Sequence, residues 1–244
     1  MIVYSDVIKS SDAGEELAFA TNDEIISDGY TLIPCNADEI DALAKKPAKT
    51  VGDVLGVDDE WERLPAEEKA KKEAESILYF VRGERVTEAA ANVDTGANAS
   101  AEGGDDEGAD DSAQEVINVV RSGLLERTSF DKKSYMPYLK GYLKSTKAYI
   151  PWAQKNREEN DWAWKALSAE EQEAEKKKVE QQIAIFEPKA MAFAKWIQAN
   201  FKDLDFYTGT SMNPDGMVIL SNYMEDGVSP YFLFWKAGLK GQKC

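Results

Sequence analysis

Five lysines between Lys132 and Lys147 form a basic cluster in a chain whose formal net charge is −16. Their apolar neighbours recur at helical spacing from Thr128 to Ile150, so we expect the lysines on or near one helix. Ammonium groups gathered in this way can bind an acidic partner, although most charged helix faces are simply solvated. Both interpretations stay open for Lys132, Lys133, Lys140, Lys144 and Lys147.

A second charged stretch is acidic and runs from Asn92 to Gln114 without any Lys or Arg. Self-repulsion and the lack of apolar side chains predict a disordered loop. Carboxylates can bind calcium, but the EF-hand spacing fails, because the positions for its glycine and final glutamate hold Asp110 and Val116. The stretch is therefore either a solvated loop or a weak calcium site formed by Asp105, Asp106, Glu107, Asp110 and Asp111.

The residue types that most enzymes need are scarce. Histidine is absent and the two cysteines are Cys35 and Cys244, which excludes histidine-based triads and zinc sites built from several cysteines. Nucleophile elbows, P-loops and dinucleotide-binding loops are also missing, so we expect a binding protein rather than an enzyme. The negative charge disfavours nucleic acid and anionic membranes, and no apolar run approaches the ~20 residues of a membrane span. Few cysteines and no secretory signal predict a cytoplasmic protein.

A pair of long helices must position the basic cluster. Pro137 is tolerated only in the first turn of a helix, which favours Ser134 as the N-cap of the first helix, while an earlier start of this helix stays open. The residues Ser168-Ala169-Glu170-Glu171 form a capping box that opens the second helix. Together these signals predict an extended helical hairpin over 128–201.

The stretch from Asp205 to Gly238 is predicted to form three short strands joined by tight turns. Asn213-Pro214-Asp215-Gly216 and Glu225-Asp226-Gly227 have the composition of turns in which glycine supplies positive φ. The apolar run from Tyr231 to Trp235 indicates a strand that is covered on both faces.

Three further strands are expected nearer the N-terminus. Met1–Ile8 is a weakly alternating strand, and Glu115–Leu125 is an apolar strand returning to the sheet. Ile77–Glu88 has the pattern of a hairpin that turns at Gly83.

Several of these stretches resemble the signature sequences of a known protein family. MNPDGMV, EDGVSPYFLFWKAGL and the terminal Cys244 resemble the C-terminal signature of the translationally controlled tumour protein family. MIVYSDVI resembles the family's N-terminus, and VDTGANASAEGGDDEG at Val93–Gly108 resembles its other signature. The three blocks occur in family order and touch both ends of the chain. Thr210 departs from the family pattern, which usually has glutamate at this position.

The resemblance implies an α+β fold with a tent-like mixed β-sheet core, a projecting two-helix hairpin and a disordered acidic loop. This fold is related to small zinc-binding exchange factors, whose zinc cysteines are absent here. We expect one domain over 1–244, with an insert at 37–76, a flexible loop at 92–114 and a hairpin lengthened by residues 148–170. The insert contains two helix-like pieces, roughly Asp38–Lys46 and Pro65–Ser76.

The family is described as calcium-binding and tubulin-associating, and it is linked to growth and survival. The resemblance therefore implies a cytosolic, multi-partner regulatory protein whose lysine cluster contacts tubulin or microtubules and whose acidic loop binds calcium weakly. No other cofactor is expected.

The resemblance also implies an alternative, guanine-nucleotide exchange on a Rheb-type small GTPase. Gly14-Glu15-Glu16-Leu17 resembles the family's Gly-Asp-Glu-Leu, which assigns the exchange role to Glu16. Interactions with cell-death regulators map near Glu24–Tyr30, where the plainer interpretation is a sheet edge. Cys244 implies a disulfide-linked dimer under oxidation of a protein that is otherwise a monomer.

Overall fold

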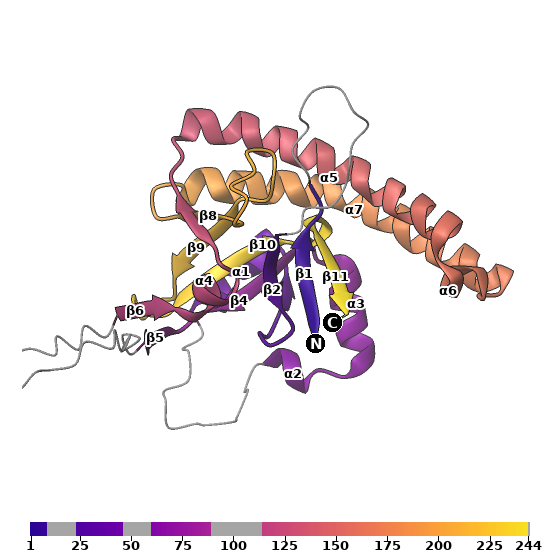
Figure 1. Cartoon of the computed structure of the whole chain (residues 1–244), viewed down its shortest axis with the longest axis horizontal. Coiled ribbons are helices and arrows are strands. Elements are labelled where there is room, and N and C mark those ends of the chain that lie inside the picture. Colours follow the sequence, from indigo (N-terminus) through magenta and orange to yellow (C-terminus); the bar gives the residue numbers. More distant parts are fainter. Residues whose placement is uncertain (9–22, 46–59, 89–113, 244) are drawn as a thin grey trace, which may run out of the picture.

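A computed structural model describes residues 1–8, 23–45, 60–88 and 114–243. The smaller sheet of its body has the strand order β11-β1-β2, so the strands nearest the two ends of the chain pair with each other (Figure 1). These strands are β1 (Ile2–Asp6), β2 (Glu24–Ser27) and β11 (Leu239–Lys243). The strand predicted at the N-terminus is confirmed.

The larger sheet has the strand order β3-β4-β10-β9-β8-β7, and all its neighbouring strands are antiparallel. Its strands are β3 (Ile33–Cys35), β4 (Leu78–Arg82), β7 (Glu126–Thr128), β8 (Asp205–Thr208), β9 (Ile219–Tyr223) and β10 (Pro230–Trp235). Every residue of β10 is buried, because this apolar strand lies inside the sheet and is covered on both faces. The three strands predicted over the last part of the chain are confirmed.

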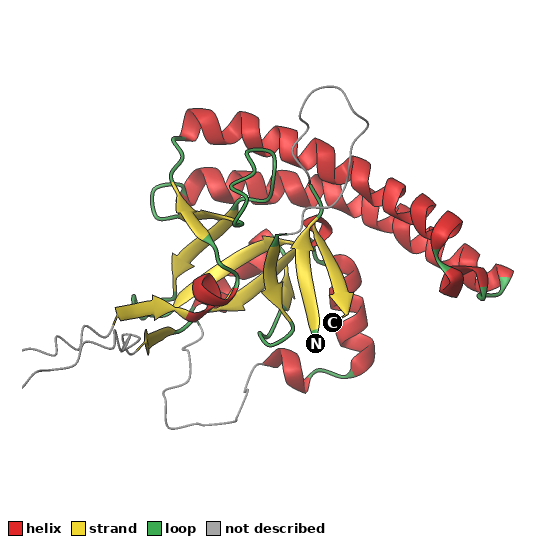
Figure 2. Cartoon of the chain, in the orientation of Figure 1, coloured by secondary structure: helices red, strands yellow, loops and turns green. Residues whose placement is uncertain are grey.

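Two long helices pack side by side against this sheet. They are α5 (Lys132–Asn160) and α7 (Ala169–Asn200), joined by the short α6 (Trp162–Lys165). Trp235 at the end of β10 lies against both, with its ring centroid 4.9 Å from that of Phe193 and 6.3 Å from that of Tyr142. Figure 2 shows the outer ends of the helices extending beyond the sheets. The predicted α+β fold with a projecting hairpin is confirmed.

The segment predicted as an insert connects β3 with β4, two strands that pair directly. It contains α1 (Ala37–Ala44), α2 (Glu60–Arg63) and α3 (Ala66–Glu75). α1 buries Ile40 and Leu43, whereas α3 buries no residue, as its Ala, Glu and Lys composition predicts. Both helices agree with the predicted pieces to within two residues. No helix in the described ranges is long and apolar enough to cross a membrane.

The hairpin predicted at Gly83 is wrong. β4 belongs to the larger sheet, whereas β5 (Arg85–Glu88) pairs with β6 (Gln114–Ile117) in a separate two-stranded sheet. The Gly83 amide donates to the carbonyl of Pro230 at 2.8 Å, and a Cβ at Gly83 would lie 2.9 Å from the ring of Phe232. The glycine therefore permits close packing where the chain leaves one sheet for another.

The strand predicted over Glu115–Leu125 ends after β6 and continues as α4 (Asn118–Ser122). Asn118 explains the change, because its side-chain oxygen accepts from the amides of Val119 at 2.7 Å and Glu84 at 2.9 Å. Such side-chain bonds to the backbone compete with a strand ladder.

The two predicted turns use glycine differently. Gly227 has a φ of +68°, as expected for an Asp-Gly turn, whereas Gly216 has no positive φ, and the nearby positive φ of 49° belongs to Met212, just before the predicted turn. A Cβ at Gly216 would lie 2.8 Å from the Asp6 carboxylate. Gly216 is therefore required by close approach rather than by backbone conformation.

Candidate functional site: a basic face on the first hairpin helix

The basic cluster lies on α5, and Asp131 fixes where this helix begins. The Asp131 carboxylate accepts from the backbone amide of Ser134 at 3.3 Å and also from the Ser134 hydroxyl. The prediction of Ser134 as N-cap is therefore wrong, because Asp131 performs this role three residues earlier. Pro137 then lies just beyond the first turn, where its missing amide removes one intrahelical hydrogen bond.

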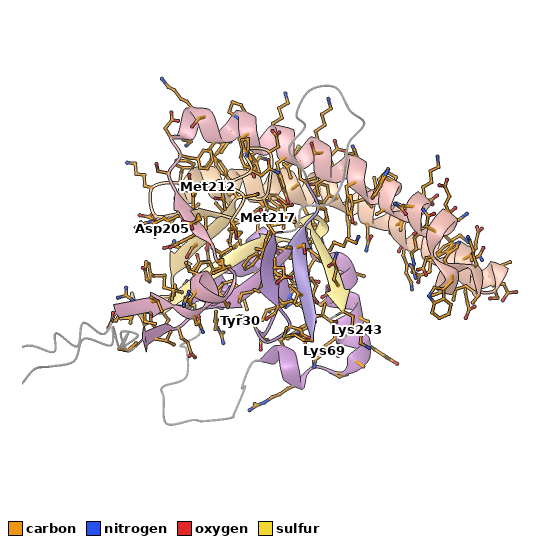
Figure 3. The ribbon with its side chains drawn as sticks, in the orientation of Figure 1. Tyr30, Lys69, Asp205, Met212, Met217 and Lys243 are labelled. Atoms are coloured by element: carbon orange, nitrogen blue, oxygen red, sulfur yellow. The ribbon has the colours of Figure 1, made fainter. Side chains whose placement is uncertain are left out.

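The inward face of α5 is aromatic and buried. Its buried residues recur every three or four positions, at Tyr135, Leu139, Tyr142 and Thr146. Beside them, the Tyr138 hydroxyl donates to the carbonyl of Gly216 at 2.5 Å and accepts from the amide of Val218 at 2.8 Å. Figure 3 shows Met212 and Met217 of the same loop on the hairpin side of the sheets. α5 is thus fastened to the loop between β8 and β9.

The outward face carries four of the five predicted lysines, and all four are exposed. They follow one another at spacings of seven, four and three residues, which keeps them within a single stripe of the helix. At 1.5 Å per residue the stripe is about 21 Å long. We call it the lysine face, and it consists of Lys133, Lys140, Lys144 and Lys147.

The lysine face is only partly neutralised. Lys147 pairs with Glu187 of α7 at 2.9 Å, whereas Lys133, Lys140 and Lys144 form no ion pair with any residue that the structure describes. The fifth lysine, Lys132, lies apart and donates to the carbonyl of Gln198 at 3.0 Å. Because residues 132–147 contain no Asp or Glu, the face is locally positive on a chain of net charge −16.

A buried carboxylate beneath this helix was missed by the sequence analysis. Asp6, at the end of β1, accepts from the amides of Ile8 at 3.0 Å and Met217 at 2.6 Å. Burial raises the pKa of the Asp6 carboxyl to about 7; the charge of Asp23 adds to the increase and the amide donors oppose it. An aspartate within the otherwise apolar Met1–Ile8 strand was the available signal.

Asp23 was missed in the same way. Its carboxylate accepts from the Ser211 amide at 3.3 Å and from the Ser211 hydroxyl. A Cβ at Gly209 would lie 2.8 Å from this carboxylate, so the glycine lets the two segments meet. Thr210 between them is exposed, and it stands where the family pattern usually has glutamate.

The other predicted site residues divide into two groups. Glu24–Tyr30 contains β2, which is an edge strand of the smaller sheet, as the plainer interpretation held. The remaining candidates lie outside the described residues, and their roles stay predictions; they are Glu16, Asp105, Asp106, Glu107, Asp110, Asp111 and Cys244.

Metal and thiol chemistry find little support in the described parts of the chain. Within these parts, no three His, Cys, Asp or Glu side chains are grouped so that they could hold a metal ion. Cys35 is fully buried, and this burial raises the pKa of its thiol well above the ordinary value. A buried thiol of this kind is unreactive.

Comparison with known proteins agrees with this architecture. Residues 58–240 match the family model described as translationally controlled tumour protein. The chain belongs to this family. A translationally-controlled tumor protein homolog of Neurospora crassa is 40% identical over 244 residues, covering 100% of this chain and 99% of the relative. The homolog of Yarrowia lipolytica is 46% identical over 172 residues, covering 70% of this chain and 87% of the relative.

A solved structure supports the same assignment. It is the translationally controlled tumor-associated protein p23fyp of Schizosaccharomyces pombe, which is 35% identical, covers 100% of both chains and superposes with a TM-score of 0.53. Membership of the translationally controlled tumour protein family supports a general role as a growth-related regulatory protein.

Proposed function

We propose that this protein is a non-enzymatic regulatory protein that binds acidic partners on its lysine face, and that tubulin in microtubules is such a partner. The observation that carries the proposal is the charge pattern of α5. Four exposed lysines share one stripe, three of them without an ion pair in the described chain, and residues 132–147 contain no carboxylate.

The surroundings of the face favour an acidic, flexible partner. The rest of the protein is strongly acidic, so it repels an acidic partner that approaches anywhere other than α5. An acidic segment is attracted only near α5, within about one Debye length of ~8–10 Å at ordinary ionic strength. Acidic tubulin tails match this requirement. Because α5 is held by Tyr138 and its buried aromatic face, the lysines are presented on a rigid element.

Co-sedimentation with microtubules tests the proposal. The double variant Lys140→Glu, Lys144→Glu should weaken binding at least about tenfold, and binding of the unmodified chain should fall steeply with added salt. Microtubules whose acidic tails have been removed by protease should bind it poorly.

The matched control is Lys71→Glu, Lys243→Glu, which changes the net charge equally. Both residues are exposed and lie away from the lysine face, on α3 and β11. Equal loss of binding in both double variants would show that only total charge matters and would contradict a specific site on α5.

The second candidate function is guanine-nucleotide exchange on a Rheb-type small GTPase through Glu16. Its support is that the chain is held on both sides of this residue: the amide of Ile8 bonds to Asp6, and Asp23 bonds to Ser211. Nucleotide release from the GTPase should accelerate with added protein and lose this acceleration with Glu16→Ala. No acceleration at high protein excess would eliminate this function without affecting the tubulin proposal.

Calcium binding by the acidic loop and contacts with cell-death regulators remain part of the proposed multi-partner role. Calorimetric titration should give weak calcium binding that disappears when Asp105, Asp106, Glu107, Asp110 and Asp111 are replaced by their amides. Tight binding that survives this replacement would place the site elsewhere.

A further inference from the structure

A half-open groove lies where the outer half of the hairpin leaves the body of the protein. Its cavity volume is about 310 Å³, which is within the size range of small ligand clefts. Five elements enclose it: α5, α7, the end of α3, the single turn η1 (Lys236–Gly238) and the start of β11. The walls are mainly apolar and include Tyr149, Ile150, Val179, Ile185, Phe186 and Leu239.

The charged residues of the groove already have partners. Arg157 pairs with Glu175 at 3.3 Å, and Lys236 pairs with Glu73 at 2.9 Å. An ionic ligand would have to displace these carboxylates. An uncharged apolar group with one hydrogen-bonding edge suits the groove better, because the exposed amide of Gln182 also lines it.

The tip of the same hairpin presents such a group. The indole of Trp162 is 81% exposed, which is unusual for a tryptophan, and exposed tryptophans are frequent anchors of protein interfaces. The structure around it is well fixed. Asp161 accepts from the amide of Ala163 at 2.8 Å, and the guanidinium of Arg157 lies 5.3 Å from the ring centre of Trp164, which is 4% exposed. The tip therefore holds Trp162 in place without burying it.

We propose that two copies of this chain pair through antiparallel hairpins, with the Trp162 indole of each copy seated in the groove of the other. The groove and the indole both involve the outer half of the hairpin, which we call the arm. Ala153 lines the groove, and Trp162 follows nine residues later, about 14 Å along a helix. A two-fold axis between two such arms brings each indole opposite the other groove. The contact is then made twice, as in other isologous dimers.

The charge distribution favours this arrangement over other contacts between copies. Residues 149–182 contain six basic and eight acidic side chains, a net charge of −2, while the whole chain has −16. The arms can therefore approach each other with little repulsion while the acidic bodies stay apart. Because the contact consists of two indoles and the groove residues around them, we expect a weak dimer that forms at high protein concentration and dissociates on dilution.

Sedimentation velocity over a wide range of concentration tests the pairing. The full chain carries Cys244→Ser, so that a terminal disulfide cannot contribute. A reversible dimer is expected, and Trp162→Ala should raise its dissociation constant at least about tenfold. Ala153→Phe, which fills the groove from within its own chain, should have the same effect. Met191→Ala is the control, because Met191 is 58% exposed on α7 and does not line the groove.

Disulfide trapping locates the contact. Chains with Trp162→Cys are mixed with chains carrying Gln182→Cys, both in the Cys244→Ser background, and a mixed disulfide should form faster than with Met191→Cys chains. A chain that stays monomeric at all concentrations, or a dimer unaffected by Trp162→Ala, overturns the proposal. The proposal is also overturned if the chain is monomeric and free indole protects the cysteine introduced by Gln182→Cys from alkylation, because the groove would then bind a different partner.

Discussion

The two halves of the helical hairpin use charge in opposite ways. In the inner half, residues 132–147 contain five lysines and no carboxylate, and only Lys147 has an ion pair among the described residues. In the outer half, basic and acidic side chains pair with one another along and between the helices. These pairs are Lys155–Glu159, Arg157–Asp161, Arg157–Glu175, Lys176–Glu158, Lys177–Glu173 and Lys178–Glu175.

The difference follows from what lies beneath each half. The inner half rests on the larger sheet, where buried aromatic side chains supply its stability without ion pairs from Lys133, Lys140 or Lys144 to any described residue. The outer half projects past the sheet, so its helices depend on each other, on ion pairs and on caps such as the Ser168–Glu171 box. The half of the hairpin that carries unpaired lysines is therefore the half whose folding does not depend on ion pairs.

The largest contrast concerns two tryptophans. Trp235→Ala removes a buried ring on which both hairpin helices pack, and it should reduce the free energy of unfolding by about 3–5 kcal/mol. Trp162→Ala should change it by less than about 0.5 kcal/mol, because the indole is exposed. Denaturant unfolding of dilute protein measures both, and similar losses would refute the division into a packed and a projecting half.

The pH dependence of the free energy of unfolding tests the buried Asp6 carboxyl beneath the inner half of the hairpin. The folded Asp6 carboxyl has a pKa of about 7 and an unfolded value of 3.8, so the folded state binds the proton more tightly. The contribution of Asp6 to the free energy of unfolding should therefore fall as the pH rises from about 4 to about 7, by at most about 1.4 kcal/mol per pH unit, and level off above. Asp6→Asn does not titrate, so its stability relative to the unmodified chain should improve from pH 5 to pH 8. A constant difference would contradict the assignment.

The hydrogen bonds of Tyr138 fasten the inner half to the loop beneath it. Tyr138→Phe leaves the Gly216 carbonyl and the Val218 amide without this partner, which should cost about 1–3 kcal/mol of unfolding free energy. Amide hydrogen exchange of residues 212–218 should increase together with this loss. Unchanged exchange there would mean that the other hydrogen bonds of the loop, from Met217 to Asp6 and from Asn213 to the Ile8 carbonyl, are sufficient to hold it.

Substitution of Arg157 tests how much its ion pairs and ring contact stabilise the outer half of the hairpin. Arg157→Ala removes the ion pairs with Asp161 and Glu175 and the contact with the Trp164 ring, which together should cost about 1 kcal/mol. The increase in hydrogen exchange should be confined to residues 157–175. Faster exchange in residues 132–147 as well would show that the two halves fold as one unit.

The smallest effect is expected on the lysine face. Lys144→Ala should change the free energy of unfolding by less than about 0.5 kcal/mol, because Lys144 is exposed and has no ion pair within the described chain. A loss above about 1 kcal/mol would show that the lysine face contributes to folding, and the contrast between the halves would disappear.

Much of this fold could be predicted from the sequence because its signals are local. The capping box at Ser168, the Asp226-Gly227 turn and the apolar run of β10 each identify a structure within a few residues. Two of the errors came where distant residues decide. Gly83 looks like a turn glycine, but the ring of Phe232 explains it, and Gly216 is explained by the carboxylate of Asp6.

The candidate site was predictable only in part. Helical periodicity placed the lysines on α5, and it could not show that Lys132 bonds to the end of α7 or that Lys147 pairs with Glu187. Asp6 and Asp23 were missed because their partners, Met217 and Ser211, lie far away in the sequence. The apolar neighbours of Asp6 were a local signal, whereas no local pattern distinguishes the Asp23 carboxylate from a solvated one.

A nuclear magnetic resonance titration tests most directly whether the lysine face binds an acidic tail. The isotope-labelled full chain would be titrated with a tubulin tail peptide and the backbone amide shifts followed. We predict that the largest shifts cluster at residues 133–147 and diminish with salt. Shifts confined to other parts of the chain, or no shifts at a large excess of peptide, would contradict the proposed function.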